Sequence, residues 1–318
     1  MAKSALQNPA FHDDNAAREA LEAIRWPDGP VCPHCGNLDR EKIAKGQRRA
    51  HRPGLYYCAA CNGQFTVTVG TVMERSKIPL SKWLLAMHLM GASKKGMSAL
   101  QLQRMLGVTY KSAWFLCHRI REAMRDDASN PCSLGGQNKA VEADETYVGG
   151  KAKNRAHCKP APKKAVLSLV EREGHVRSFH VADVTSKTVG SIIEKNVSAA
   201  SALMTDESVI YPKIGAKFAN HLSVNHSAGE YVRLGSYVHI NTAENFYSIL
   251  KRGITGVYHS VSEAHLHRYL AEFDFRYNNR IGLGVDDGER AVRIAKGIAG
   301  KRLTYRPINR DKNARSIH

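Results

Sequence analysis

The sequence has no apolar run long enough to span a membrane, although hydrophobic residues make up 43% of its 318 residues. Its first residues have no hydrophobic signal core and carry Asp13, Asp14 and Glu19 instead. No segment repeats at a fixed period. These absences argue against a membrane protein, a secreted protein and a repeat architecture, and they favour ordinary globular domains.

Acidic residues are scarce where basic residues are dense. The chain has 47 Lys and Arg against 29 Asp and Glu, a formal net charge of +18 and a pI near 9.7. Residues 77–121 hold eight basic residues and residues 151–164 hold six, with no acid in either stretch. From Arg290 to the end there are nine, against Asp311 alone. Separate basic patches predict a long polyanionic partner, with nucleic acid favoured over a merely solubilising charge.

Seven cysteines in a chain without a secretion signal argue for metal binding or free thiols rather than disulfides. Four of them form two CxxC pairs separated by 22 residues: Cys32, Cys35, Cys58 and Cys61. Four thiolates complete the tetrahedral shell of Zn²⁺, so we predict a structural zinc ribbon. His34 and His51 could replace one thiol. The remaining cysteines have no paired spacing and are predicted to be buried or free thiols: Cys117, Cys132 and Cys158.

The order of apolar patterns predicts an α/β protein with several parts. Residues 13–25 have helical spacing, and a helical block follows the cysteines. Strands are then expected at 141–148, 165–170, 176–181, 202–205 and 221–224, and helices at 185–197, 211–216, 241–250 and 262–277. The first three strands should form an antiparallel meander. The predicted domains are a helix and ribbon (1–75), a helical region (76–130), a mixed-sheet domain (138–285) and a basic, partly disordered tail (286–318).

The helical block has the spacing of a helix-turn-helix. Ser81 can cap a helix that Gly91 ends, and two more helices are expected at 99–106 and 110–124, joined by a turn at Gly107. Residues that could face a DNA groove or its phosphates lie in the last helix: Tyr110, Lys111, Ser112 and His118. An ordinary helical hairpin is the alternative interpretation.

Acids stand at the edge or end of separate regular elements. Asp144 lies in the first predicted strand of the sheet, Asp206 follows the fourth, and Glu244 lies in the first turn of a later helix. Three such carboxylates can hold two Mg²⁺ (or Mn²⁺) ions, which drive phosphoryl transfer on a nucleic acid. Asp144 and Asp206 would converge if their strands are neighbours.

The helix of Glu244 has two predicted faces. Lys251 follows Glu244 by seven residues, so both project from one face, with Tyr247 and Ser248 between them. The residues expected in the core are Phe246, Ile249 and Leu250.

Each acid also has a purely structural interpretation. Residues 241–244 (NTAE) fit a capping box, in which Glu244 only satisfies a backbone N–H. Asp206 could be a turn residue and Asp144 an exposed strand residue. Asp183 and Glu207 are nearby acids that composition alone leaves as further candidates.

Longer motifs resemble one known family. Residues 144–150 (DETYVGG), 205–208 (TDES) and 239–253 (HINTAENFYSILKRG) resemble bacterial insertion-sequence transposases with an N-terminal zinc ribbon, insertion-sequence family 1595, which carry an ISXO2-like transposase domain. Residues 257–260 (VYHS) and 272–280 (EFDFRYNNR) also fit. With the ribbon, the resemblance spans about residues 15–285.

The resemblance implies a ribonuclease H-like catalytic domain with an Asp-Asp-Glu site. Its residues would be Asp144, Asp206 and Glu244, and Asn241 and Asn245 are rival third ligands. Lys251 matches a lysine that follows the third acid, and with Arg252 it is an expected DNA contact. His226 would sit near the site.

The implied function is that of a transposase, which cleaves the 3′ ends of an insertion sequence with Mg²⁺ and transfers the strands. Its partners would be double-stranded DNA, as terminal repeats and target, and further copies of the chain in a homodimer or higher oligomer. The expected location is the bacterial cytoplasm, at the nucleoid. The alternatives are a zinc-ribbon DNA-binding regulator with an inactive catalytic domain and a metal-dependent nuclease of the same fold.

Overall fold

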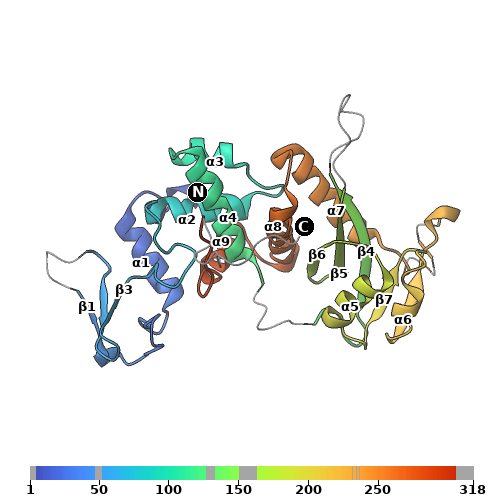
Figure 1. Cartoon of the computed structure of the whole chain (residues 1–318), viewed down its shortest axis with the longest axis horizontal. Helices are drawn as coiled ribbons and strands as arrows, with labels where there is room; N and C mark the ends of the chain where they lie inside the picture. The colour runs from blue at the N-terminus through green and yellow to red at the C-terminus, as the bar shows by residue number, and fades with distance from the viewer. Residues whose placement is uncertain are drawn as a thin grey trace, which may run out of the picture. The chain divides into compact units, whose positions relative to one another are not determined.

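The computed structural model describes residues 5–46, 52–126, 133–149, 163–230, 232–233, 235 and 237–305. The chain forms two compact units (Figure 1). Unit 1 comprises residues 1–92, 99–124 and 287–318, and unit 2 comprises residues 93–98 and 125–286. Within the described ranges, no helix combines the length and apolar character that a membrane crossing needs.

Short strands form a ribbon in unit 1: β1 (Ile43–Lys45), β2 (Tyr56–Cys58) and β3 (Gly63–Phe65). They pair antiparallel in the order β1-β2-β3. Trp26 packs edge-on against the rings of Tyr56 and Phe65, with centroids 5.4 and 5.8 Å away. Strands this short bury little apolar surface, so the ribbon depends on these rings and on the cysteines described below.

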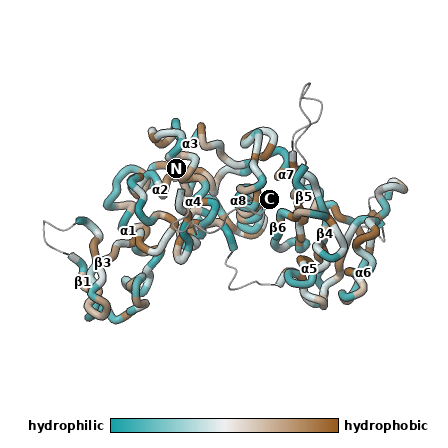
Figure 2. The backbone as a smooth tube through the Cα atoms, viewed as in Figure 1, coloured by the Kyte–Doolittle hydropathy of each residue, from teal (hydrophilic) through white to brown (hydrophobic). Residues whose placement is uncertain are grey.

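The longer helices of unit 1 are α1 (Asp14–Arg25), α2 (Leu80–Ala92), α3 (Ala99–Leu106), α4 (Tyr110–Met124) and α9 (Asp287–Lys296). Hydropathy alternates along α1 (Figure 2), which buries only Ala17 and Leu21. Helix α2 instead buries most of its residues, Trp83 and Met87 among them, against α1 and α9. The core of unit 1 is therefore centred on α2.

Two predictions about α2 are wrong. Ser81 does not cap the helix but lies inside it, where its N–H and hydroxyl donate to Asp14 Oδ1 at 3.0 and 2.6 Å. Gly91 does not end the helix: a Cβ there would lie 3.2 Å from Ile294 Cδ1 of α9, so glycine allows close helix packing. Helix α9 also means that the stretch predicted as a tail contains a packed helix. Residues 306–318 lie outside the described residues.

Unit 2 contains, in its described part, a five-stranded sheet in the order β6-β5-β4-β7-β8. The strands are β4 (Ala140–Val148), β5 (Lys164–Glu171), β6 (Val176–Val181), β7 (Ala202–Thr205) and β8 (Asn220–Ser223). Strands β4, β5 and β6 form the predicted antiparallel meander, whereas β7 and β8 run parallel to β4. The sheet is therefore mixed, with β4 at its centre.

Helices cover both faces of this sheet. Helices α5 (Ser186–Asn196) and α6 (Pro212–Gly215) supply core residues on the face to which β4 contributes Val141 and Ala143. Helices α7 (Asn241–Gly253) and α8 (Glu263–Asn278) pack on the other face. A π-helical turn, η6 (Ile254–Tyr258), directly follows α7. Side chains alternate along a strand, so the acids Glu142 and Asp144 of β4 face α7.

Candidate active site

The ribbon cysteines gather in one place. The Sγ atoms of Cys32, Cys35, Cys58 and Cys61 all lie within 4.8 Å of one another, with 3.7 Å between Cys32 and Cys61 and 3.8 Å between Cys35 and Cys58. Sulfurs at ~2.3 Å from a tetrahedral Zn²⁺ are about 3.8 Å apart, so the set fits zinc. Burial acts to raise the pKa of Cys58, but hydrogen bonds from the N–H groups of Cys61 and Ala60 and from the thiols of Cys35 and Cys32 together lower that pKa to about 7. A thiolate is thus favoured there.

The other sulfur and histidine candidates stand apart from this centre. His34 Nε2 lies 3.2 Å from the carbonyl oxygen of Gln64 rather than completing the cysteine set. Cys117 is buried in α4. His51, Cys132 and Cys158 lie outside the described residues.

Pairing of β4 with β7 brings Asp144 and Asp206 together. The parallel register places Glu142 beside Met204. Extending this register by two residues puts Asp206, which directly follows β7, beside Asp144. Met204 packs against Ile240 at the start of α7, so this position of β7 and the acids of β4 share the α7 face of the sheet. The predicted convergence therefore follows from the strand pairing.

Glu244 lies in the first turn of α7, on the exposed side of the helix. Phe246 and Leu250 point the other way and are fully buried against the sheet, as the sequence predicted. Ser248 and Lys251 are exposed like Glu244, so the predicted face is formed by these three residues. The amphipathic spacing of α7 therefore presents the acid and the lysine on one side.

Tyr247 does not belong to that exposed face. It is 4% exposed, and its hydroxyl donates a hydrogen bond to the backbone carbonyl of Asp144. Tyr247 lies three residues after Glu244, a rotation of about 300° around the helix axis, and this turns its side chain toward the sheet. The bond fastens α7 to β4 at the position of Asp144.

The neighbouring acids act electrostatically on Asp144. The pKa of Asp144 is raised to about 7 by burial first, then by the charge of Glu145, with contributions from Asp206 and Glu244. Like charges this near favour a cation between them, and a set of carboxylate oxygens is the kind that Mg²⁺ and Mn²⁺ prefer. Within the described ranges, however, three or more ligands gather tightly only at the cysteines, so the acids form a looser group.

The neighbouring acids have other partners. Glu145 Oε2 accepts a hydrogen bond from the hydroxyl of buried Tyr211, in the core on the opposite face of the sheet. Glu207 Oε1 accepts hydrogen bonds from the N–H and hydroxyl of Ser227. Asp183 Oδ1 accepts one from Thr188 Oγ1 at 2.7 Å, near the start of α5. These contacts favour structural roles for Glu145, Glu207 and Asp183.

Comparisons with known proteins identify the family of both the ribbon and the sheet domain. Residues 133–278 match the ISXO2-like transposase domain, and residues 12–64 match the transposase zinc-ribbon domain, both of insertion-sequence family 1595. The chain belongs to this transposase family. A Halobacterium salinarum protein, "Uncharacterized protein in transposable element ISH50", is 28% identical over 285 residues, which is 84% of this chain and 91% of that protein.

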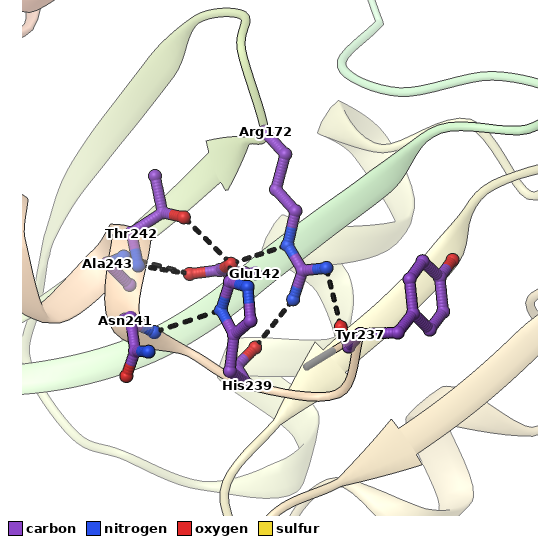
Figure 3. Close-up of polar contacts among 7 residues, drawn as sticks. All are labelled: Glu142, Arg172, Tyr237, His239, Asn241, Thr242 and Ala243. Atoms are coloured by element: carbon purple, nitrogen blue, oxygen red, sulfur yellow. Dashed lines mark hydrogen bonds and ion pairs between the residues drawn. The ribbon is translucent and has the colours of Figure 1, made fainter. Parts of the chain in front are cut away.

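A second acid of β4, Glu142, was missed by sequence reasoning. It is fully buried, and its Oε2 accepts the N–H groups of Thr242 and Ala243 at 2.8 and 2.9 Å (Figure 3). Arg172 pairs with Glu142 Oε1 at 2.7 Å. The predicted capping box is wrong, because this strand residue caps α7 and Glu244 is exposed. Its position two residues before Asp144 was a usable signal, but its partners lie far away in sequence.

The predicted DNA-facing residues of α4 divide into two groups. Tyr110 and Lys111 are exposed, and Lys111 Nζ lies 4.7 Å from the ring centroid of Tyr305. His118 is 1% exposed and packs 4.3 Å from the Trp114 ring, so the prediction that it faces DNA is wrong. His118 lies eight residues after Tyr110, a net rotation of about 80° around the helix axis, which turns it toward the core.

Three further predictions concern Arg252, the basic stretch 151–164 and His226. Arg252 is exposed beside Lys251 and binds the side chain of Ser248 at 2.7 Å. The basic loop 151–164 lies almost entirely outside the described residues, as does the side chain of His226.

Proposed function

We propose that unit 2 is a ribonuclease H-like catalytic domain that cuts and joins DNA strands in transposition. Its antiparallel meander, followed by two parallel strands with helices on both faces, supports this fold. The observation that carries the proposal is the β4–β7 register, which puts Asp206 beside Asp144 beneath the helix that carries Glu244.

Asp144, Asp206 and Glu244 would hold Mg²⁺ or Mn²⁺ through their carboxylate oxygens. When bound, such ions supply positive charge at the attacking and leaving oxygens of the phosphate. Asn241 and Asn245 are exposed in the same turn of α7 and are the alternative third ligands. Lys251, two turns along the exposed face, would bind a phosphate of the DNA strand.

The chemistry would take two steps. Water attacks a phosphorus at the end of the element; a P–O bond to the water oxygen forms, the P–O3′ bond breaks, and a free 3′-hydroxyl results. This hydroxyl then attacks a phosphodiester of target DNA, forming one P–O bond as another breaks. The number of phosphodiester bonds is conserved in the second step, and no Ser or Tyr nucleophile takes part.

DNA recognition would fall to unit 1 and to the exposed face of α7. We assign the element's terminal repeats to the zinc ribbon and to α3 and α4, which would act as a helix-turn-helix with Tyr110 and Lys111 facing the duplex. Lys251 and Arg252 would contact DNA near the acids. Two element ends must be joined, so the active form would hold at least two copies of the chain.

One assay tests the proposal. Labelled DNA carrying the element's ends is incubated with a target plasmid and Mg²⁺, and both nicked ends and joined products are measured. Asp144→Ala and Asp206→Ala should abolish cleavage but leave binding of the ends intact. Strand transfer by either variant would refute the site. Nicking without joining would identify a nuclease, and specific binding without nicking a regulator.

A further inference from the structure

Glu142 is a charged residue with no access to water. It is 0% exposed in the centre of the sheet, where an unpaired carboxylate would be strongly destabilising. Four groups donate to it: the N–H groups of Thr242 and Ala243, the Thr242 hydroxyl at 2.9 Å and Arg172 Nε. In addition, His239 Nδ1 lies 3.2 Å from Glu142 Oε1. Its oxygens are thus already occupied by protein donors.

Arg172 extends these contacts to the segment that enters α7. Its Nη1 and Nη2 donate to the carbonyls of Tyr237 and His239 at 2.6 and 2.8 Å, while Nε binds Glu142 (Figure 3). The N–H of Asn241 donates to His239 Nδ1 at 3.3 Å. One arginine therefore holds both the capping acid and the last turn of chain before the helix.

The location of these bonds matters more than their number. The two capped N–H groups belong to the residues directly before Glu244, and Glu142 lies two residues before Asp144 on the same face of β4. The N-terminus of a helix is stabilised by negative charge, so the cap fixes where α7 begins. A shift of the cap would move Glu244 relative to Asp144.

We propose that Glu142 and Arg172 are positioning residues that set the distance between Glu244 and Asp144, without binding the metal themselves. The inference rests on the proposed function, because Glu142 and Arg172 can position a metal site only if the three acids bind the metal. Groups behind metal ligands commonly change metal affinity 10- to 100-fold when they are altered.

The test is Mn²⁺ binding to the zinc-loaded full chain without DNA, measured by electron paramagnetic resonance. Glu142→Gln keeps the side-chain shape and one oxygen for the two N–H groups, but it loses the ion pair with Arg172. We expect Mn²⁺ affinity to fall about tenfold. Arg172→Lys keeps the positive charge but cannot reach all three acceptors, so it should lower the Mn²⁺ affinity by a smaller factor. This second variant keeps the test valid if Glu142→Gln fails to fold.

The matched control is Glu171→Gln. Glu171 is a partly buried acid at the end of β5 that binds Lys139 and the N–H of Gly135, and it has no bond to α7. Urea stability is measured for every variant. Loss of stability in Glu142→Gln and Arg172→Lys with unchanged Mn²⁺ affinity would overturn the proposal, as would an equal loss of affinity in Glu171→Gln.

Failure of the underlying function has a different signature. If Mn²⁺ binding by the wild-type chain survives Asp144→Ala, the acids do not form the metal site, and both proposals fall. If Asp144→Ala removes binding and Glu142→Gln does not weaken it, only the positioning role falls.

A second, independent feature is a lysine-lined groove of about 450 Å³ on the opposite face of the sheet, between α5 and α6. Lys187, Lys195, Lys213 and Lys217 line it, together with one acid, Glu194. Lys217 pairs with Glu194 at 2.7 Å. The other three lysines are exposed, and the described residues show no acid within ion-pair distance of them.

We infer that this groove binds the phosphate backbone of duplex DNA, outside the acid site. Like charges held together on two packed elements repel one another, and a polyanion relieves that repulsion. Each phosphate neutralised by a lysine adds about 0.9 to the slope of log affinity against log salt for duplex DNA. Three unpaired lysines can therefore add about 2 to 3 to that slope.

The test is fluorescence anisotropy with a random-sequence 30-base-pair duplex over a series of salt concentrations without Mg²⁺, so that no cleavage is needed. Combined Lys187→Gln, Lys195→Gln and Lys213→Gln should lower the slope by about 2 to 3. Lys139→Gln, which removes a lysine paired with Glu171 outside the groove, should leave the slope unchanged. An unchanged slope in the triple variant would refute the assignment. A triple variant that binds inorganic phosphate more weakly than the wild-type chain, but duplex DNA with the same salt slope, would also refute it.

Discussion

Replacing the aspartate at the centre of the candidate site should stabilise unit 2 while it removes activity. Asp144 is mostly buried and next to other acids, which raises its pKa to about 7. Without a bound cation, its ionised form is therefore unfavourable in the folded state. Asp144→Asn keeps the shape of the side chain and removes the charge.

The direction with pH follows from proton linkage. Asp144 keeps its proton in the folded state up to about pH 7, whereas in the unfolded chain it loses it near pH 4. The folded state binds more protons between these values, so stability falls as pH rises through this window. A shift of this size corresponds to about 4 kcal/mol at most, and we expect Asp144→Asn to be more stable than wild type by about 2 to 4 kcal/mol at pH 8.

The assay must distinguish the unfolding of unit 2 from that of unit 1, by comparing a signal of the whole chain with a signal of unit 1 alone. All three tryptophans, Trp26, Trp83 and Trp114, belong to unit 1, so their fluorescence reports that unit alone. Urea unfolding would be followed by circular dichroism at pH 4, 6 and 8 in metal-free buffer with zinc kept in the ribbon. Asp274, whose pKa burial also raises to about 7, contributes equally to both proteins and cancels in the difference.

The decisive quantity is how the stability difference between Asp144→Asn and wild type changes with pH. It should be small at pH 4 and grow up to pH 8, with no change in the tryptophan signal. A difference that stays constant from pH 4 to pH 8 would refute the reasoning, because a neutral packing effect has no pH dependence.

Three further outcomes are expected. Cys58→Ser or removal of zinc should unfold the ribbon and expose Trp26, seen as a red shift that Cys117→Ser does not cause. Tyr247→Phe should cost about 1 to 2 kcal/mol by urea unfolding, since the Asp144 carbonyl loses a buried donor; an unchanged midpoint would contradict this bond. Gly91→Val should cost about 1 to 3 kcal/mol, seen in the fluorescence of unit 1, because α2 and α9 meet closely there.

Much of the fold follows from local patterns. The strands of unit 2 and helices α3, α4, α5, α7 and α8 lie within a few residues of their predicted positions. Helix α9 escaped prediction because its basic residues suggested a solvated tail, although its apolar side packs on α2. His118 and Tyr247 were predicted on exposed helix faces, but both are buried. Helical spacing gives the order of side chains around the helix axis, but it does not give the width of the face that packs against the rest of the protein.

The sequence alone predicted the four clustered cysteines of the ribbon, the order of strands and helices, and the acids and lysine expected around the site. These depend on spacing along the chain, because the backbone geometry of turns, strands and helices is local. Only the tertiary structure decided that Asp206 lies beside Asp144, through the parallel pairing of β4 and β7. It also decided that Glu142, 100 residues before Thr242, caps the helix of Glu244. Such contacts depend on which distant surfaces meet, and spacing along the chain does not encode that.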